Sequence, residues 1–511
     1  MARVIRGATA KEEPMERVRR RRPLVAALLV AAMAGEPMTS SGQTSQPDQL
    51  RQELEEMKEQ LRRVEEQMKK QEAIIQKQQA VIDRLTAQQP AVAAPVGGAP
   101  PPPAQVQAAA APPTAPAPAP AAPTPEKPRE PWSPSQPITL LSGARGYMNI
   151  SFDALMDFGW STTSNVTAIE TGDHDPLQRG FTLPNEEIFL DGAVDPYFKG
   201  VADLVFKLDE NNNTDVELEE VYLTTTALPW NLQTKGGQFF SEFGRINQQH
   251  PHAWDFVDQP LVIGRMFGPE GLRNPGARLS WLVPTPFYSE IFLAVQNGQG
   301  ETAYSFRNSG TEFFGRPPLD RTVRNPGDLL YTPRLVASFD LTDSQTLVAG
   351  VSGAFGPNDS GSSTRTQIYG GDLYWKWKPS WQAGGFPFLA FQTEALGRRF
   401  EAGPVGGTTP LPSQALYDWG IYSQLLYGFT QRWVAGVRAD WVSNNASGLP
   451  PADRLAGRFR WSPNLTFFPT EFSKIRLQYN YDHGKTIPNG DDSSVWLQVE
   501  FLLGSHAAHK F

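Results

Sequence analysis

The chain has 511 residues and contains no cysteine. Disulfide bonds, thiolate metal sites and a lipidated N-terminal cysteine are therefore excluded. Long hydrophobic runs are also missing: no stretch of about eighteen uncharged apolar residues occurs, so a membrane-spanning helix is not expected. The formal net charge of -8 is mild and spread along the chain, and it provides no basic surface for nucleic acid.

The N-terminus has the pattern of an export signal. Five arginines within Arg17–Arg22 precede the apolar stretch Leu24–Ala34, which ends in an Ala-Met-Ala cleavage pattern. We interpret residues 1–34 as a signal peptide, and the polar residues before Met15 indicate that translation starts at Met15. The alternative is a short membrane anchor, which is disfavoured because the apolar core is only about eleven residues long.

Residues 46–88 have the pattern of an α-helical coiled coil. Apolar residues recur there at spacings of four and three, and Gln71 and Gln78 interrupt the seam. The seam consists of Leu50, Leu54, Met57, Leu61, Val64, Met68, Ile75, Ile82 and Leu85. Because an isolated helix this polar is marginally stable, self-association is favoured, as a dimer or a trimer. A single solvated helix or a partner-binding helix is the alternative.

Proline and alanine dominate the next segment. This composition forbids a continuous helix and favours extended polyproline II, so residues 89–142 are predicted to form a semi-rigid linker without a core.

The part from 143 to 511 is predicted to be all-β. Aromatic residues, glycines and alternating apolar and polar residues mark sixteen strands. The predicted strands are 146–160, 187–195, 198–209, 216–227, 234–245, 276–283, 287–297, 334–341, 345–356, 366–377, 386–399, 416–427, 433–442, 454–467, 473–482 and 493–503.

The connections between these strands alternate in length. Short links such as DLTDSQ, GFTQR and PTEFS alternate with longer ones. The long connections are 161–186, 246–275, 298–333, 400–415, 443–453 and 483–492. An up-and-down antiparallel sheet places alternate connections at opposite ends, and bacterial outer-membrane barrels have short periplasmic turns and long outside loops. An even strand number then places both chain ends, and the coiled coil, in the periplasm.

The strands have one polar and one apolar face. In KIRLQYNYD, residues 474–482, charged and amide side chains alternate with Ile, Leu and Tyr. A soluble sandwich would bury the apolar face, but the polar face carries mid-strand charges that a dry core rarely holds. Aromatic residues gather near strand ends, at Trp160, Trp230, Trp377, Trp433, Trp441, Trp461, Phe467 and Phe468. The sequence therefore predicts a 16-stranded antiparallel transmembrane β-barrel with a wet interior.

Two regions of this part carry a family resemblance. One is EEIFLDGAVDPYFKGVADLVFKLD with VELEEVYLTTTALPWNLQTKGGQFFSEFGRIN, and the other is FRWSPNLTFFPTEFSKIRLQYNYD with the last strand VWLQVEFLLG. Together they resemble the phosphate-selective porin O and P family over most of residues 144–511. The resemblance implies a homotrimer of passive sixteen-stranded outer-membrane channels, each with a constriction. Phe511 resembles the terminal aromatic residue of such barrels, although GSHAAHKF follows the clear strand.

Charged residues on the inward phase are candidates to line the pore. They are Arg438, Arg458, Arg460, Lys474, Arg476, Asp203, Asp372, Asp440 and Glu500. The family's phosphate channels use a ladder of inward arginines and lysines, whereas this set mixes both signs. An anion preference, extending to phosphate, and solvated lumen charges with little selectivity both stay open.

The long connection 246–275 is the candidate constriction loop. Its candidate residues for the constriction or for contact with solutes are His250, His252, Asp255, Asp258, Arg265, Glu270 and Arg273. Histidine nitrogens and carboxylate oxygens suit a divalent metal such as zinc. The spacing matches no strong metal motif, so we expect hydrogen bonds to hold the loop, with a metal site at His250 and His252 as the weaker alternative.

The sequence favours a porin over an enzyme. No nucleophile elbow, phosphate-binding loop or HExxH motif occurs, so neither catalysis nor a cofactor is expected, and an outer-membrane hydrolase with an unrecognised triad is the alternative. The predicted function is passive diffusion of ions and small solutes. Alternatives are a receptor for a metal or chelate, and a tether from the outer membrane to the cell wall. The expected partners are outer-membrane lipid, further copies of the chain and the cell wall through the coiled coil.

Overall fold

The computed structural model describes residues 136–143, 146–307, 312–379, 385–407, 410–444, 456–485 and 487–504. The predicted signal peptide, the coiled coil and most of the linker lie outside the described residues. Among the helices of the described part, none is both long and apolar enough to cross a membrane.

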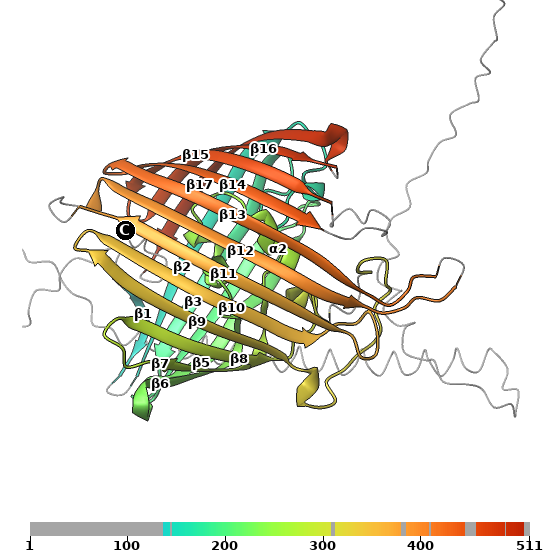
Figure 1. Ribbon diagram of the computed structural model, residues 1–511. Helices are drawn as coiled ribbons and strands as arrows, with labels where there is room; N and C mark the ends of the chain where they lie inside the picture. The colour runs from blue at the N-terminus through green and yellow to red at the C-terminus, as the bar shows by residue number, and fades with distance from the viewer. Residues whose placement is uncertain are drawn as a thin grey trace, which may run out of the picture. The chain divides into compact units, whose positions relative to one another are not determined.

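Sixteen antiparallel strands, β2 to β17, form a closed barrel (Figure 1). Each strand pairs with the next one along the chain, and β17 pairs with β2 to close the sheet. The strands are β2 (Tyr147–Ser161), β3 (Gly180–Ala193), β4 (Phe198–Leu208), β5 (Thr214–Thr225), β6 (Leu232–Phe240), β7 (Arg273–Leu282), β8 (Tyr288–Gln296), β9 (Leu330–Thr342), β10 (Gln345–Pro357), β11 (Arg365–Trp377), β12 (Phe388–Ala402), β13 (Gln414–Thr430), β14 (Trp433–Asn444), β15 (Arg458–Thr470), β16 (Ser473–Gly484) and β17 (Asp491–Leu503). The predicted barrel is confirmed.

One further strand differs from the sequence expectation. β1 (Ile138–Ser142) lies in the segment assigned to the linker, and it pairs with the start of β2 through Ile138 and Ile150. β17 ends beside the same strand, where Leu503 faces Phe152. β1 therefore continues the line of β17 along the edge of β2. Its sequence, ITLLS, contains neither proline nor alanine, so the Pro/Ala-rich composition ends before this strand.

The two ends of the barrel differ in their connections. One end carries the links 194–197, 226–231, 283–287, 343–344, 378–387, 431–432 and 471–472. The other carries 162–179, 209–213, 241–272, 297–329, 358–364, 403–413, 445–457 and 485–490. The predicted alternation holds for most links, but 209–213, 358–364 and 485–490 are only five to seven residues long and are shorter than 378–387 at the other end. In 209–213, Asp209 accepts hydrogen bonds from the backbone N–H groups of Asn211 and Asn213. The barrel begins and ends at the short-turn end.

The polar face of the strands points inward. In β16, Lys474, Arg476 and Gln478 are at most 3% exposed, whereas the alternating Ile475 and Leu477 are 39% and 51% exposed on the outside. The predicted orientation of the two faces is confirmed.

Exposed aromatic residues form two bands on the outer face. Trp160 and Trp419 lie toward the long-loop end, and Trp433 and Phe429 lie at the short-turn end. From Trp419 to Phe429 the strand advances ten residues, which is about 33 Å at the usual rise and about 25 Å in height at the usual barrel tilt. Aliphatic side chains such as Leu425 cover the outside between the bands.

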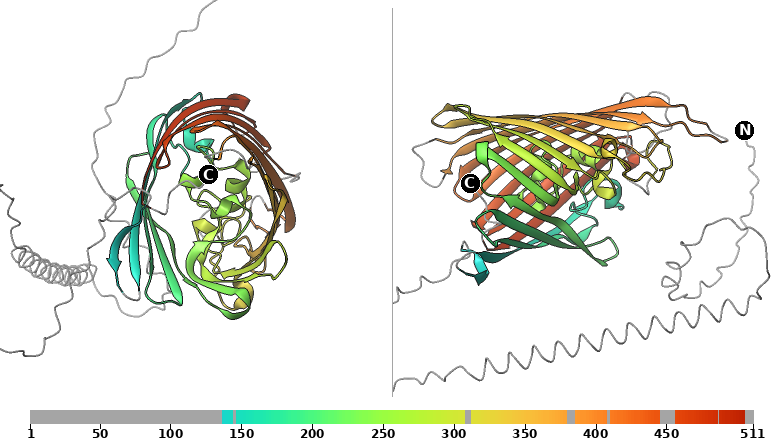
Figure 2. Two further views of the ribbon diagram at one scale, coloured as in Figure 1. Left: turned by 90° about the vertical axis from the view of Figure 1, so that its left-hand side faces the viewer. Right: turned by 90° about the horizontal axis from the view of Figure 1, so that it is seen from below.

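The connection between β6 and β7, residues 241–272, lies inside the barrel and is called the inner loop below (Figure 2). It contains the short helix α2 (Leu261–Phe267), which contacts β12, β13 and β14. Gly420 of β13 makes room for it, because a Cβ atom there would lie 2.6 Å from Val262. The apolar side of the loop packs against the wall through a cluster that includes Phe243, Leu261, Val262, Ile263, Met266, Phe267, Tyr422 and Val442.

Candidate functional site inside the barrel

The inner loop lies between two parts of the wall with opposite charge. We call one the basic wall, formed by Arg438 of β14, Arg458 and Arg460 of β15, and Lys474 and Arg476 of β16. We call the other the acidic wall, formed by Asp153 of β2, Glu187 of β3, Asp203 of β4, and Glu219 and Glu220 of β5. All five carboxylates of the acidic wall are at most 7% exposed.

Asp258 attaches the inner loop to the basic wall. Arg438 Nη2 lies 3.1 Å from Asp258 Oδ1, and Arg438 Nη1 donates to the Asp258 carbonyl oxygen at 2.7 Å. Arg460 also pairs with Asp258, and it lies 2.6 Å from Glu170 Oε2 of the connection 162–179. Burial by itself would raise the pKa of Asp258, but Arg438 and Arg460 outweigh it and lower that pKa below its usual range. Asp258 is therefore held as a carboxylate.

Two further cations of the basic wall bind the backbone of the inner loop. Lys474 Nζ donates to the His252 carbonyl oxygen at 2.6 Å, and Arg476 Nη2 donates to that of Trp254 at 2.9 Å. Lys474 also pairs with Glu500 of β17. The cations of the basic wall therefore hold the backbone of the inner loop in place and also keep Asp258 ionised.

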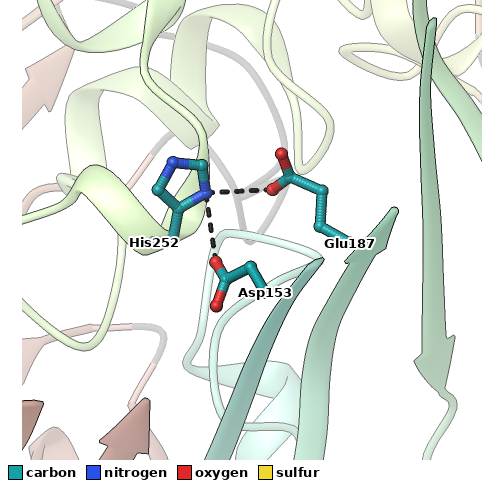
Figure 3. Close-up of side chains that lie close together, drawn as sticks. All are labelled: Asp153, Glu187 and His252. Atoms are coloured by element: carbon teal, nitrogen blue, oxygen red, sulfur yellow. Dashed lines mark hydrogen bonds and ion pairs between the residues drawn. The ribbon is translucent and has the colours of Figure 1, made fainter. Parts of the chain in front are cut away.

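The two histidines of the inner loop point to the acidic wall. His250 Nδ1 lies 2.7 Å from Glu219 Oε2 and 3.0 Å from Asp203 Oδ2. His252 Nδ1 lies 2.9 Å from Glu187 Oε2 and 3.1 Å from Asp153 Oδ2 (Figure 3).

These carboxylates control the charge of both imidazoles. Burial by itself would lower the pKa of His252, but Glu187 and Asp153 outweigh it and raise the pKa to about 10. Burial likewise acts against a charged His250, yet Glu219 and Glu187 raise its pKa well above the usual value. Without another cation, both rings are therefore protonated at neutral pH.

A second acidic group beside this wall contains its own permanent cations. Lys207 Nζ lies 2.5 Å from Glu217 Oε1 and 2.9 Å from Glu270 Oε1, and Arg273 Nη2 lies 2.8 Å from Glu270 Oε2. Burial would raise the pKa of Glu270, but His174, Lys207 and Arg273 lower it to about 2. This group is balanced by side chains of the chain itself.

The candidate pore-lining residues all point inward, but most are covered. Arg438, Arg460, Lys474, Arg476, Asp440 and Glu500 are at most 3% exposed, and Asp372 is 7% exposed. Asp372 pairs with Arg334, and Arg458 donates to Asp482 Oδ1 at 2.8 Å. Their role in lining a conducting path stays a prediction.

The candidate residues of the constriction loop fall into separate places. His250 and His252 come together, whereas Asp255 and Asp258 face other partners: Gln424 Nε2 donates to Asp255 Oδ2 at 2.8 Å. Arg265 donates to the Ala456 carbonyl oxygen, and Arg273 pairs with Glu217. The four potential metal ligands of the loop therefore do not form one site.

Sequence reasoning did not select Asp153, Glu187, Glu219 and Glu220, which contact the histidines. It also did not select Arg245 and Lys376, two partly exposed cations inside the barrel; Arg245 lies over the Tyr374 ring and Lys376 over the Phe388 ring. The alternation of side chains along each strand indicates which residues point inward. It does not indicate which strand faces which segment of the inner loop.

Solved structures similar to this chain include an outer membrane channel and a porin. One is the outer membrane channel DcaP of Acinetobacter baumannii, with 12% identity and a TM-score of 0.46 over 71% of this chain and 99% of that one. Another is an anion-selective porin from Comamonas acidovorans, with 6% identity and a TM-score of 0.45 over 70% of this chain and 100% of that one. A likeness this weak says nothing about what this chain does.

Sequence comparison gives one firm relationship. No family model matches the chain, so its resemblance to the phosphate-selective porins stays a prediction. The chain is 36% identical over 359 residues to an uncharacterized protein of Aquifex aeolicus (strain VF5), and the match covers 65% of this chain and 71% of the relative. The chain therefore belongs to the same family as this Aquifex aeolicus protein.

Proposed function

We propose that the chain is an outer-membrane protein that forms a narrow channel for passive diffusion of ions and small solutes. The observation that carries the proposal is a closed sixteen-stranded barrel whose inner face is polar and whose outer face is apolar. A closed sheet satisfies its backbone groups internally, as a lipid environment requires. The aromatic bands and the height between them match a bilayer of ordinary thickness.

The inner loop supports a narrow channel rather than a wide one. Sixteen strands enclose enough space for an aqueous path. The inner loop takes up part of that space, because its backbone and Asp258 bind the basic wall while its histidines reach the acidic wall. Solutes then pass beside the loop, where Arg245 and Lys376 are partly exposed. These two cations support a modest preference for anions.

A charge on the outer face tests whether lipid covers it. Leu477→Arg places a cation where 51% of the side chain is exposed, in the middle of β16. We expect a loss of about 2 to 4 kcal/mol in folding into lipid vesicles, because lipid does not solvate the cation. Asn211→Arg, in the exposed link 209–213, is the control and should change little. Equal effects for the two variants would contradict membrane insertion.

Conductance in planar bilayers tests the channel itself. The full-length protein should give small ohmic steps. A variant in which residues 250–258 become a glycine-serine segment of equal length should give several-fold larger steps, because the loop contacts to both walls are lost. Its heat-modifiable band on gels would show that the barrel is still folded. Folded wild-type protein without conductance would overturn the proposal.

The assembly predictions form a separate part of the proposal. We expect a homotrimer, with the coiled coil on the periplasmic side reaching the cell wall. Chemical cross-linking in native membranes would detect the trimer. Deletion of residues 46–137 distinguishes a tether from a channel. If the protein is a tether, the deletion should detach the outer membrane from the cell wall without changing permeability. If the protein is only a channel, the outer membrane should stay attached.

A further inference from the structure

Glu187 lies between the two histidines of the inner loop. Its Oε2 atom is 2.9 Å from His252 Nδ1, and its Oε1 atom is 3.8 Å from His250 Nδ1. Two groups of potential metal ligands share it: Asp153, Glu187 and His252 form one, and Glu187, Asp203 and His250 form the other. All of these residues are buried. The arrangement is that of a bridging carboxylate with one imidazole at each oxygen.

The charges of this region do not balance. The acidic wall has five carboxylates, and the two histidines can supply at most two positive charges. Arg273 Nη1 also lies 3.6 Å from Glu219 Oε1, but Arg273 is shared with Glu217 and Glu270. Asp153 Oδ1 and Asp203 Oδ1 are buried, and no hydrogen-bond donor reaches either atom among the residues that the structure describes. Buried carboxylates without donors are costly, so this region requires additional protons or a cation.

The neighbouring group of His174, Glu217 and Glu270 has similar ligand chemistry but a different balance. Lys207 and Arg273 both lie within ion-pair distance of its two glutamates. Permanent cations therefore already occupy the place that a metal ion would take. At the acidic wall the histidines are the main counter-charges, and imidazoles exchange a proton for a metal.

The second nitrogen of one histidine is also placed as metal ligation requires. His250 Nε2 lies 3.3 Å from Glu220 Oε2, while its Nδ1 faces Asp203 and Glu219. Histidines that bind a metal through one nitrogen usually donate the other N–H to a carboxylate or carbonyl group. Glu220 can fix the tautomer in which Nε2 carries the proton and Nδ1 offers its lone pair to a metal.

We propose that the acidic wall and the inner loop bind two divalent transition-metal ions of the zinc type, bridged by Glu187. His252 Nδ1, Asp153 and Glu187 Oε2 hold one ion. His250 Nδ1, Asp203, Glu219 and Glu187 Oε1 hold the other.

The ligand distances fit this assignment. From each Nδ1 to its carboxylate oxygens they are 2.7 to 3.8 Å, and four of the five are shorter than the roughly 3.4 Å expected between ligands about 2.1 Å from a tetrahedral metal, so these side chains would separate slightly on binding. Imidazole with carboxylate is a ligand set that zinc accepts. The ions would hold the inner loop on the acidic wall, and this role does not depend on conduction.

Zinc binding to the full-length protein in detergent tests the proposal. The protein should be purified without a histidine tag and in a background with His506→Asn and His509→Asn, so that tail imidazoles do not contribute. Calorimetric titration with ZnCl2 and elemental analysis should give two ions per chain. His252→Asn should reduce this to one, and Glu187→Gln should weaken both sites at least tenfold, because the bridge is lost.

His174→Asn is the matched control, since this buried histidine lies 3.7 Å from Glu219 but is not one of the proposed ligands. It should leave the stoichiometry at two. Heat-modifiable mobility and tryptophan fluorescence would confirm that each variant is folded. If folded Glu187→Gln binds as much zinc as its parent, or if His174→Asn loses as much as His252→Asn, the assignment is wrong. A parent stoichiometry of zero or one would also overturn the bridged pair.

Discussion

The basic wall and the acidic wall hold the same loop by different means. On the basic wall, Arg438 and Arg460 meet Asp258, Glu170, Asp440 and Asp482, so cations and anions alternate in one buried network. On the acidic wall, five carboxylates face two histidines. The first contact is made by permanently charged side chains that pair with carboxylates and with backbone carbonyl oxygens of the loop. The second contact depends on whether the imidazoles bind a proton or a metal ion. The attachment of the loop to the acidic wall can therefore change with conditions, whereas its attachment to the basic wall cannot.

The largest expected effect comes from removing the anion that the basic wall surrounds. Asp258→Asn leaves Arg438 and Arg460 buried with less compensation, and we expect a loss of about 3 to 5 kcal/mol in the free energy of unfolding. Urea titration in detergent, followed by tryptophan fluorescence, measures it. Asp491→Asn removes an exposed partner of His483 and should change stability far less. Similar losses for the two variants would contradict the network.

A pH-dependent effect is expected at Glu270, beside the acidic wall. The pKa of Glu270 is lowered from 4.5 to about 2 by His174, Lys207 and Arg273, against the effect of burial. Its contribution of about 3 kcal/mol is therefore present above pH 4.5 and is lost as the pH falls toward 2. The stability difference between wild type and Glu270→Gln should shrink over that range. If the stability difference between wild type and Glu270→Gln stayed constant with pH, the charge of the Glu270 carboxylate would not contribute to stability.

A smaller effect, on selectivity, should follow from the partly exposed cations. Replacing Arg245 and Lys376 by glutamine removes two positive charges from the interior without opening the buried network. Reversal potentials under a salt gradient should move toward cation preference. The double change Arg458→Glu and Arg460→Glu is a less specific test, because Arg460 is fully buried and pairs with Asp258. An unchanged potential in the glutamine variant would place the conducting path elsewhere.

The smallest effect is expected for a charge pair outside both walls. Arg399 and Glu401 lie 2.7 Å apart, with side chains about one third exposed. Arg399→Ala should change the free energy of unfolding by about 0.5 kcal/mol or less. The same urea titration measures this value and sets the scale against which the buried pairs are judged. A loss approaching that of Asp258→Asn would show that burial does not separate these pairs.

Much of the barrel was predictable because its signal is local. Side chains of a strand alternate between faces, so Lys474 and Leu477 indicate their sides without knowledge of any other strand. All sixteen predicted strands are present, although β3 begins at Gly180, seven residues before its predicted start. The strand β1 escaped prediction because five residues are too few to show a period.

The candidate site was only partly predictable. His250, His252, Asp255 and Asp258 are close in sequence, which suggested one group of ligands. In the structure the histidines face β2 to β5, whereas Asp258 faces β14 and β15. An extended loop segment can point neighbouring side chains in opposite directions. The spacing of the four residues along the chain therefore did not indicate which strands they would contact.

The sequence by itself determined sixteen strands, each with one polar and one apolar face, because strand periodicity and turn lengths are local properties of the chain. Only the tertiary structure decided that the inward arginines hold the inner loop and that Asp153, Glu187, Asp203 and Glu219 gather around two histidines. Those carboxylates come from four different strands. Their meeting depends on the closure of the barrel and on the path of one loop across it, and neither is encoded in a local pattern.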